Sequence, residues 1–320
     1  MHIGTLEIPA GAGLSPMAGV TDAAMRLLCF EMGAAWAVSE MLSAKGWIYS
    51  GGKNEATRQL LKLLPGEGVV GLQLFGREPK LVAQAARELS NEGFRFIDLN
   101  FGCPAPKITG NGEGSALMRE PELIGEIVSA VKAKVSLPVT AKIRAGWDGD
   151  SVNAPEVARI CEQAGTDAIT VHGRTREQQY AGRADRGVIR DAVQAVSCPV
   201  IGNGDVTCGA DAESMIRETG CAAVQIGRAA EGNPWVFRDV ARRLAGEEFT
   251  PPTPREKMDM AERHMELERE IHGDRQAILE MRKHIAWYAA GIPGAARFRT
   301  RINQLTDPEE IRREMRAFGE

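Results

Sequence analysis

The 320-residue sequence has little net charge, no long apolar run and no low-complexity segment. Its 39 basic and 43 acidic residues leave a net charge of −4, which excludes a uniformly basic nucleic-acid-binding protein but leaves room for a local basic patch. Because no run of about 18 apolar residues occurs, we expect no transmembrane helix and no membrane partner. The first residues have no basic segment followed by an apolar stretch, so we expect no signal peptide.

Paired cysteine motifs are also absent. The six cysteines form no Cys-x-x-Cys pair, and a chain of this size can build a core without disulfides. We therefore expect free thiols in a reducing cytoplasm, and we expect no bound metal.

Glycine, in contrast, is in excess, at 35 of 320 positions, which favours tight turns or backbone lying against a ligand. Over the first 240 residues, short apolar runs alternate with segments of helical period. Eight runs are predicted as strands, at 14–17, 35–38, 69–74, 96–99, 139–143, 168–171, 199–201 and 222–226. A Gly-rich dinucleotide-binding fingerprint does not follow the first run, so we favour an α/β (β/α)₈ TIM barrel over an open doubly wound sheet.

The strand rhythm stops after residue 245. We predict a barrel over 1–245, a Pro-rich linker over 246–254 (GEEFTPPTP) and a small all-helical C-terminal domain over 255–320. Its helices are expected at 255–273, 274–290, 302–305 and 308–318. Basic residues cluster there, and from the residues alone they fit a solvated helix face.

Polar and small residues follow the predicted strands, where the active site of a TIM barrel lies. They are 15–19 (SPMAG), 39–41 (SEM), Gln73, Asn100, Lys142, Arg144, 172–174 (HGR), 202–205 (GNGD) and 227–228 (GR). The last two turns are Gly-rich and precede helical segments. Each alone fits an ordinary turn, but together they predict a phosphate site made by backbone N–H groups.

Three single residues leave several roles open. Lys142 within a strand fits an internal ion pair, a Schiff-base lysine or a cation beside a reduced cofactor. His172 fits a structural histidine or a ligand contact. Cys103 lies in a long Gly-containing loop and fits a general acid, a nucleophile or an inert thiol.

Residues 97–108 (IDLNFGCPAPKI) and 114–117 (GSAL) closely resemble the signature of tRNA-dihydrouridine synthases. Further segments match that family in the same order, at 16–22 (PMAGVTD), 39–41, 142–147 (KIRAGW), 172–176 (HGRTR), 203–205, 226–229 (IGRA), 282–284 (RKH) and 287–288 (WY). The resemblance covers nearly the whole chain and is strongest to the bacterial B-type branch. One departure is Gly110, where many members carry Lys or Arg.

The resemblance implies an FMN-dependent barrel that uses NADPH to reduce uridines of the tRNA D loop to 5,6-dihydrouridine. Hydride passes from reduced FMN to C6, and Cys103 gives a proton to C5. By position, the FMN contacts are Pro16, Met17, Ala18, Gln73, Lys142, His172, Asn203, Gly204, Asp205, Gly227 and Arg228. Asn100 and Arg174 are expected at the uracil edge, and Arg282, Lys283, Arg297, Arg299 and Arg301 at the tRNA backbone. We expect a monomer.

Two other functions remain open from the sequence. An FMN-dependent oxidoreductase of free pyrimidines, similar to dihydroorotate dehydrogenase, would share the barrel and a loop cysteine. It would have no use for a basic helical domain. An RNA-binding protein without catalysis would have no use for Cys103, Lys142 and the phosphate turns.

Overall fold

The computed structural model describes residues 1–320, and its centre is a closed ring of parallel strands. The ring consists of β3 (Ala12–Leu14), β4 (Trp36–Val38), β6 (Val70–Phe75), β7 (Phe96–Phe101), β8 (Val139–Arg144), β9 (Ala168–His172), β10 (Val200–Asn203) and β11 (Ala223–Ile226). It closes because β3 pairs with both β11 and β4, while β4 also pairs with β6. A short β5 (Leu42–Ser43) adds to the end of β6. The predicted TIM barrel is confirmed.

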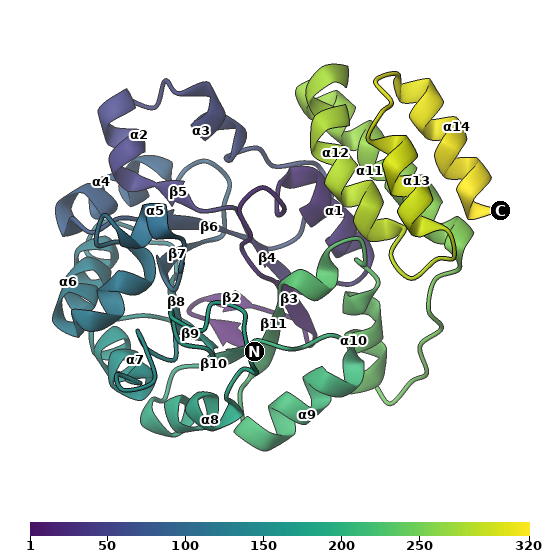
Figure 1. Cartoon of the computed structure of the whole chain (residues 1–320). Helices are drawn as coiled ribbons and strands as arrows, with labels where there is room; N and C mark the ends of the chain where they lie inside the picture. Colours follow the sequence, from purple (N-terminus) through teal and green to yellow (C-terminus); the bar gives the residue numbers. More distant parts are fainter.

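Helices surround the strands on the outside of the ring (Figure 1). They are α1 (Ala23–Glu31), α2 (Ala44–Ser50), α3 (Glu55–Gln59), α4 (Pro79–Leu89), α5 (Pro106–Thr109), α6 (Pro121–Lys132), α7 (Ala154–Gln163), α8 (Arg186–Ala195), α9 (Gly209–Thr219) and α10 (Val236–Leu244). Two 3₁₀ turns, η1 (Gly114–Arg119) and η2 (Arg228–Ala230), lie in the β7–α6 and β11–α10 connections. Proline begins α4 and α6, where its missing N–H costs no helical hydrogen bond.

The N-terminal end of the barrel is plugged by apolar side chains. A hairpin of β1 (His2–Ile3) and β2 (Leu6–Glu7) contributes Ile3 and Ile8 to a cluster with Trp36 and Phe96. Glycines make room for the two aromatic rings, since a Cβ at Gly13 would lie 2.1 Å from Trp36 and one at Gly71 would lie 2.2 Å from Phe96. This end is therefore a packed core, and space for a ligand remains only at the opposite end.

Four helices follow the barrel and form a bundle beside α1 (Figure 1). They are α11 (Pro254–His272), α12 (Asp274–Tyr288), α13 (Ala295–Ile302) and α14 (Pro308–Gly319). Residues 247–253 between α10 and α11 have no helix or strand. Against the barrel, Tyr288 packs edge-on to Trp235 with 6.4 Å between ring centroids. None of the helices is long and apolar enough to cross a bilayer.

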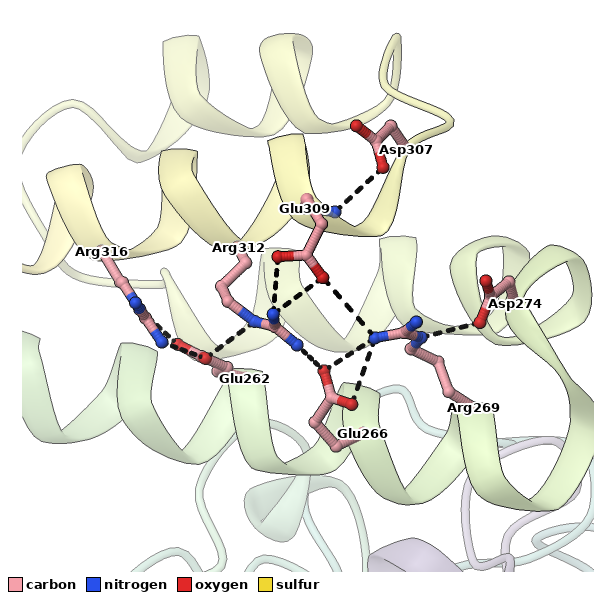
Figure 2. A network of polar contacts seen from close by, with 8 residues as sticks. All are labelled: Glu262, Glu266, Arg269, Asp274, Asp307, Glu309, Arg312 and Arg316. Carbon is pink, nitrogen blue, oxygen red and sulfur yellow. Dashed lines mark hydrogen bonds and ion pairs between the residues drawn. The ribbon is translucent and has the colours of Figure 1, made fainter.

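An ion-pair network joins α11 to α14 (Figure 2). Arg312 of α14 lies at its centre and contacts Glu262 at 2.9 Å, Glu309 at 2.6 Å and also Glu266. Arg269 extends the network by pairing with Glu266 at 3.1 Å. Several shared carboxylates make such a network more stabilising than isolated surface pairs.

Replacing Arg312 by alanine is expected to lower the free energy of unfolding by about 1–2 kcal/mol, because three carboxylates are left without their shared partner. The matched control is Arg313→Ala, since Arg313 is exposed and its ion pair with Glu310 is long, at 3.8 Å. It should change stability by less than about 0.5 kcal/mol. Urea unfolding at low and high salt measures both. Equal effects of the two variants would contradict a stabilising network.

Two sequence predictions differ from the structure in their boundaries. The first strand is Ala12–Leu14 instead of 14–17, because Pro16 cannot donate a ladder hydrogen bond and residues 15–17 turn into the cavity. The helical piece expected at 302–305 is instead α13, which ends at Ile302. Helices α2, α3, α5 and α10 were not predicted.

Candidate active site

A cavity of about 760 Å³ opens at the C-terminal end of the barrel strands. Its volume lies within the range of small-molecule and cofactor sites. The residues that line it come from all eight strands or from the loops that follow them. The loop after β4 contributes Met41. Among the predicted residues, the cavity is lined by Pro16, Met17, Ala18, Gln73, Asn100, Cys103, Lys142, His172, Asn203, Gly204, Asp205, Gly227 and Arg228.

Buried amides and a carboxylate form a hydrogen-bonded chain inside the barrel. Gln73 Nε2 donates to Asp98 Oδ2 at 2.6 Å, and Gln73 Oε1 accepts from Asn100 Nδ2 at 2.7 Å. Thr140 donates to the other Asp98 oxygen at 2.5 Å. Because the carboxylate is buried, the pKa of Asp98 is raised despite these donors. The chain fixes the orientation of Gln73 and Asn100 at the cavity wall.

The loop after β7 holds Cys103 at the cavity. Asn100 Oδ1 accepts from the backbone N–H of Gly102 at 3.1 Å and of Cys103 at 2.9 Å. The Cys103 carbonyl accepts from the N–H of Ser115 at 3.0 Å and from its hydroxyl at 2.9 Å. Burial raises the pKa of the Cys103 thiol, although the Ala105 N–H, Arg144 and Lys142 oppose the shift. At neutral pH the side chain is a thiol that can donate a proton.

Lys142 places a cation in the interior of the barrel. Its ammonium donates to Asn203 Oδ1 at 3.0 Å, and Asn203 Nδ2 donates to the Gln225 carbonyl at 2.6 Å. No carboxylate forms an ion pair with Lys142. The structure therefore does not support the sequence-based alternative in which Lys142 belongs to an internal ion pair. Burial, aided by Arg144, lowers the pKa of Lys142 to about 8. The remaining donors of the ammonium are available to a ligand.

Two buried polar atoms in the cavity wall have no hydrogen-bond partner within the chain. They are His172 Nε2 and Gln225 Oε1. Burial and the nearby cations, Lys142 first among them, hold the pKa of His172 well below its usual range, so the ring is neutral. Unpartnered buried polar atoms cost free energy, and a polar ligand would satisfy both.

The turns after β10 and β11 present backbone N–H groups. Those of Gly204, Asp205, Gly227 and Arg228 find no acceptor within the chain. Gly204 has φ 112° and Asp205 has φ 55°, a left-handed conformation that non-glycine residues seldom adopt. Consecutive free N–H groups in such turns form an anion-binding concavity. Together with the unpartnered His172 and Gln225 atoms, the cavity fits a polar cofactor that carries a phosphate.

Arg174 lies outside the cavity lining, unlike the other predicted barrel residues. It is buried, pairs with Asp205 at 2.8 Å and donates to the carbonyls of Ala181 and Gly182. Its position therefore fits support of the β9–α8 and β10–α9 loops better than the uracil contact expected from the sequence.

The predicted basic residues of the bundle divide into two groups. Arg282 is half-buried and donates to the Leu305 carbonyl at 3.3 Å, while Lys283 pairs with Glu280 at 2.7 Å. Arg297 and Arg299 are exposed on α13 and form no ion pair within the chain, whereas the exposed Arg301 pairs with Glu314 at 3.2 Å. Arg297 and Arg299 are thus the guanidinium groups most available to a partner.

Comparison with known proteins decides the family. A family model described as dihydrouridine synthase matches residues 13–319, nearly the whole chain. The chain belongs to the dihydrouridine synthase family. The tRNA-dihydrouridine synthase B of Xanthomonas axonopodis pv. citri is 42% identical, with 97% of this chain and 92% of that protein covered. The protein of the same name from Pseudomonas aeruginosa is 40% identical, with 99% and 95% covered.

A relative described as a probable tRNA-dihydrouridine synthase, from Rickettsia conorii, is 39% identical over 99% of this chain and 96% of its own length. Among solved structures, morphinone reductase in complex with tetrahydroNAD matches with a TM-score of 0.53 and 14% identity, covering 80% of this chain and 92% of that one. This likeness concerns the fold alone. Membership of the dihydrouridine synthase family supports a flavin as the cofactor.

Two residues of the cavity, Arg144 and Tyr180, were given no role from the sequence. Arg144 donates to the carbonyls of Gly102 and Thr175 at 2.7 and 2.9 Å, which links the cysteine loop to the β9–α8 loop. Tyr180 is 53% exposed at the rim, with Arg228 4.6 Å above its ring. The position of Arg144 at a strand end was a visible signal, whereas Tyr180 lies in a loop without any periodic pattern.

Proposed function

We propose that this chain reduces uridines of tRNA to 5,6-dihydrouridine, with FMN as its flavin and NADPH as its reductant. The observation that carries the proposal is one cavity in which a protonated thiol, Cys103, and a buried cation, Lys142, accompany unpartnered polar atoms. Relatives that match over nearly the whole chain bear the name tRNA-dihydrouridine synthase.

FMN would be held by both ends of the cavity. Its phosphate would meet the free N–H groups of Gly204, Asp205, Gly227 and Arg228. Its ring would give His172 Nε2 the hydrogen-bond partner that this atom lacks, and would lie within reach of Lys142. The neutral amide of Gln73 and residues 16–18 form the adjoining wall of the cavity. Gln73 and Asn203 are already oriented by hydrogen bonds, so little side-chain freedom is lost on binding.

When bound and reduced, FMN supplies a hydride to C6 of the uracil ring. The thiol of Cys103 donates the proton that C5 then requires, and solvent reprotonates the thiolate. Asn100 acts as a positioning residue, because it binds the Cys103 N–H at 2.9 Å. The ammonium of Lys142 offsets negative charge that develops during the transfer. In sum, the uracil gains a hydride and a proton.

The target base must leave the folded tRNA to enter the cavity, which requires recognition of RNA shape and extrusion of the nucleotide. We assign residues 255–320 to tRNA binding, residues 1–245 to catalysis and residues 246–254 to the linker, with the chain acting as a monomer. Arg297 and Arg299 would bind phosphates, with Arg301 beside them on α13. Lys283 and Arg282 would contribute less, because each has a partner within the chain.

Simultaneous replacement of Arg297 and Arg299 by alanine is expected to weaken tRNA binding. The slope of log affinity against log salt concentration should fall by roughly 0.7–0.9 for each phosphate that is no longer neutralised. The matched control is Arg217→Ala on the last turn of α9, because that end of the helix faces away from the cavity. Filter binding at several salt concentrations measures both. An unchanged slope in the double variant would place the RNA surface elsewhere.

The proposed activity is tested through cofactor and substrate. Flavin released from the purified protein is separated against FMN and FAD, and NADPH oxidation is followed with unmodified tRNA, free uridine or orotate as the electron acceptor. We expect equimolar FMN and oxidation that depends on tRNA. Turnover of free pyrimidines without tRNA would favour a free-pyrimidine oxidoreductase, and absence of flavin would favour a binding protein.

A further inference from the structure

A buried cluster of metal-ligand side chains lies between the barrel and the helical bundle. Asp22 is the N-cap of α1, while His264 and Glu268 lie on α11 and His284 lies on α12. One carboxylate oxygen of Asp22 and one ring nitrogen of each of His264 and His284 lie within 4.8 Å of one another. The cluster is outside the active-site cavity, and the proposed reaction does not use it.

Glu268 lies beside this group of three. Its Oε1 is 3.8 Å from His264 Nε2, its Oε2 is 3.6 Å from His272 Nε2, and its carboxyl group faces that of Asp22. His264, Glu268 and His284 are each at most 1% exposed. The central set is thus two imidazoles and two carboxylates from three helices; three of these side chains are buried, and Asp22 is partly exposed.

The free atoms of these side chains point to a missing ligand. His264 Nε2, His284 Nδ1 and both oxygens of Glu268 are buried and have no hydrogen-bond partner. Each such atom costs free energy of folding, and native structures rarely gather several in one place. A cation that accepts lone pairs from all four groups would remove the cost for the cluster as a whole.

The charge of the cluster points to the same conclusion. Asp22 and Glu268 both contribute a carboxyl group beside His264, and two neighbouring carboxylates repel each other unless a proton or a cation lies between them. The nearest ammonium, Lys283, is already bound to Glu280 at 2.7 Å. Two carboxylates and two neutral imidazoles balance the charge of a divalent ion.

We propose that Asp22, His264, Glu268 and His284 form a binding site for a divalent transition metal such as Zn²⁺. Imidazole nitrogen and carboxylate oxygen in a tetrahedral set of four are typical ligands of Zn²⁺. The second ring nitrogen of His264 faces the Tyr288 hydroxyl at 3.3 Å, and such an outer partner commonly orients a metal-bound histidine. This proposal departs from the sequence expectation of no metal.

The position of the site gives the metal a structural role. Asp22 ends the loop that begins at Pro16, and residues 16–18 and 20 of this loop line the active-site cavity. The other three ligands belong to the bundle. A bound ion would therefore join the cavity loop to the helical domain, independently of any flavin or tRNA.

The test uses the full-length protein, stripped of metal with a chelator, and Zn²⁺ alone as the probe. Zn²⁺ binding is measured by competition with a chromophoric chelator, and thermal unfolding is followed with and without the ion. We expect equimolar binding and a higher Tm with Zn²⁺. His284→Ala should weaken binding by more than the roughly 100-fold that loss of an outer partner costs. The control is His2→Ala, an exposed histidine on β1, which should leave binding unchanged.

The variant Glu268→Gln distinguishes a bound metal from a proton shared between the two carboxyl groups. Glutamine has the shape of protonated glutamic acid, so it can replace the acid in a shared-proton pair but not as a charged metal ligand. If the site holds a metal, this variant should lose most of its affinity for Zn²⁺ and the associated rise in Tm. Absence of Zn²⁺ binding by the wild-type chain, or binding retained in both His284→Ala and Glu268→Gln, would overturn the proposal. These readouts do not involve dihydrouridine formation, so they stand whatever the outcome for the reaction.

Discussion

Replacement of Cys103 by alanine is expected to remove dihydrouridine formation while the flavin stays bound and reducible by NADPH. Proton donation by a positioned side chain contributes about 10²–10⁴-fold to rate, and a decrease in this range is predicted. The cavity offers no other thiol, since Cys103 is the only cysteine in its lining. Burial raises the pKa of Cys103, so the group starts each turnover protonated.

Transient kinetics separates the acid from the cofactor. Single-turnover reduction of the flavin by NADPH should be unchanged in Cys103→Ala, whereas its reoxidation by tRNA should be slow. Cys198→Ala is the matched control, because Cys198 is also a half-buried free thiol but lies outside the cavity. Full dihydrouridine formation by Cys103→Ala would show that another group supplies the proton.

Replacement of Lys142 by methionine is expected to slow dihydrouridine formation by roughly 10²–10³-fold, the usual cost of removing one donor to developing negative charge. Methionine is close in length to the lysine stem, so the barrel interior should remain filled. The ammonium also donates to Asn203, which keeps it directed into the cavity. Lys132→Met is the control, because Lys132 pairs with Asp167 on the outer side of the barrel, away from the cavity.

The lowered pKa of Lys142 adds a pH test on the protein without flavin. Since burial lowers this pKa to about 8, the ammonium is present below pH 8 and is lost as the pH rises through that value. The affinity for FMN should therefore decline across this range in the wild type. The Lys142→Met variant should bind FMN more weakly and show no such decline. If the affinity for FMN declined equally in both proteins, the decline would arise from the titration of a group other than Lys142.

The fold was predictable because its signals are local. Every barrel strand is a short, largely buried segment with several apolar residues, and proline or an amphipathic period marks most helices. The error in the first strand has a local cause as well, since the apolar run continues past Leu14 although Pro16 cannot take part in a ladder. Helix α10 was missed although its buried apolar residues, Val236, Phe237 and Val240, follow a helical period.

The site was predictable only in part. Residues at the C-terminal ends of strands, such as Asn100 and Asn203, are brought together by the barrel topology, so their positions could be inferred. The burial of Arg174 could not be inferred, because it depends on how the loop around Ala181 folds back. The cluster of Asp22 and His284 was equally hidden, since only the packing of the bundle on α1 brings these distant residues together.

Reduction of uridine within tRNA is tested most directly by nucleoside mass spectrometry with position mapping. Unmodified tRNA is incubated with the protein, FMN and NADPH, and the wild type is compared with Cys103→Ala. We predict dihydrouridine at one or a few D-loop positions, formed by the wild type and dependent on Cys103. Unchanged tRNA, despite bound and reducible flavin, would contradict the assignment of this cavity to tRNA reduction.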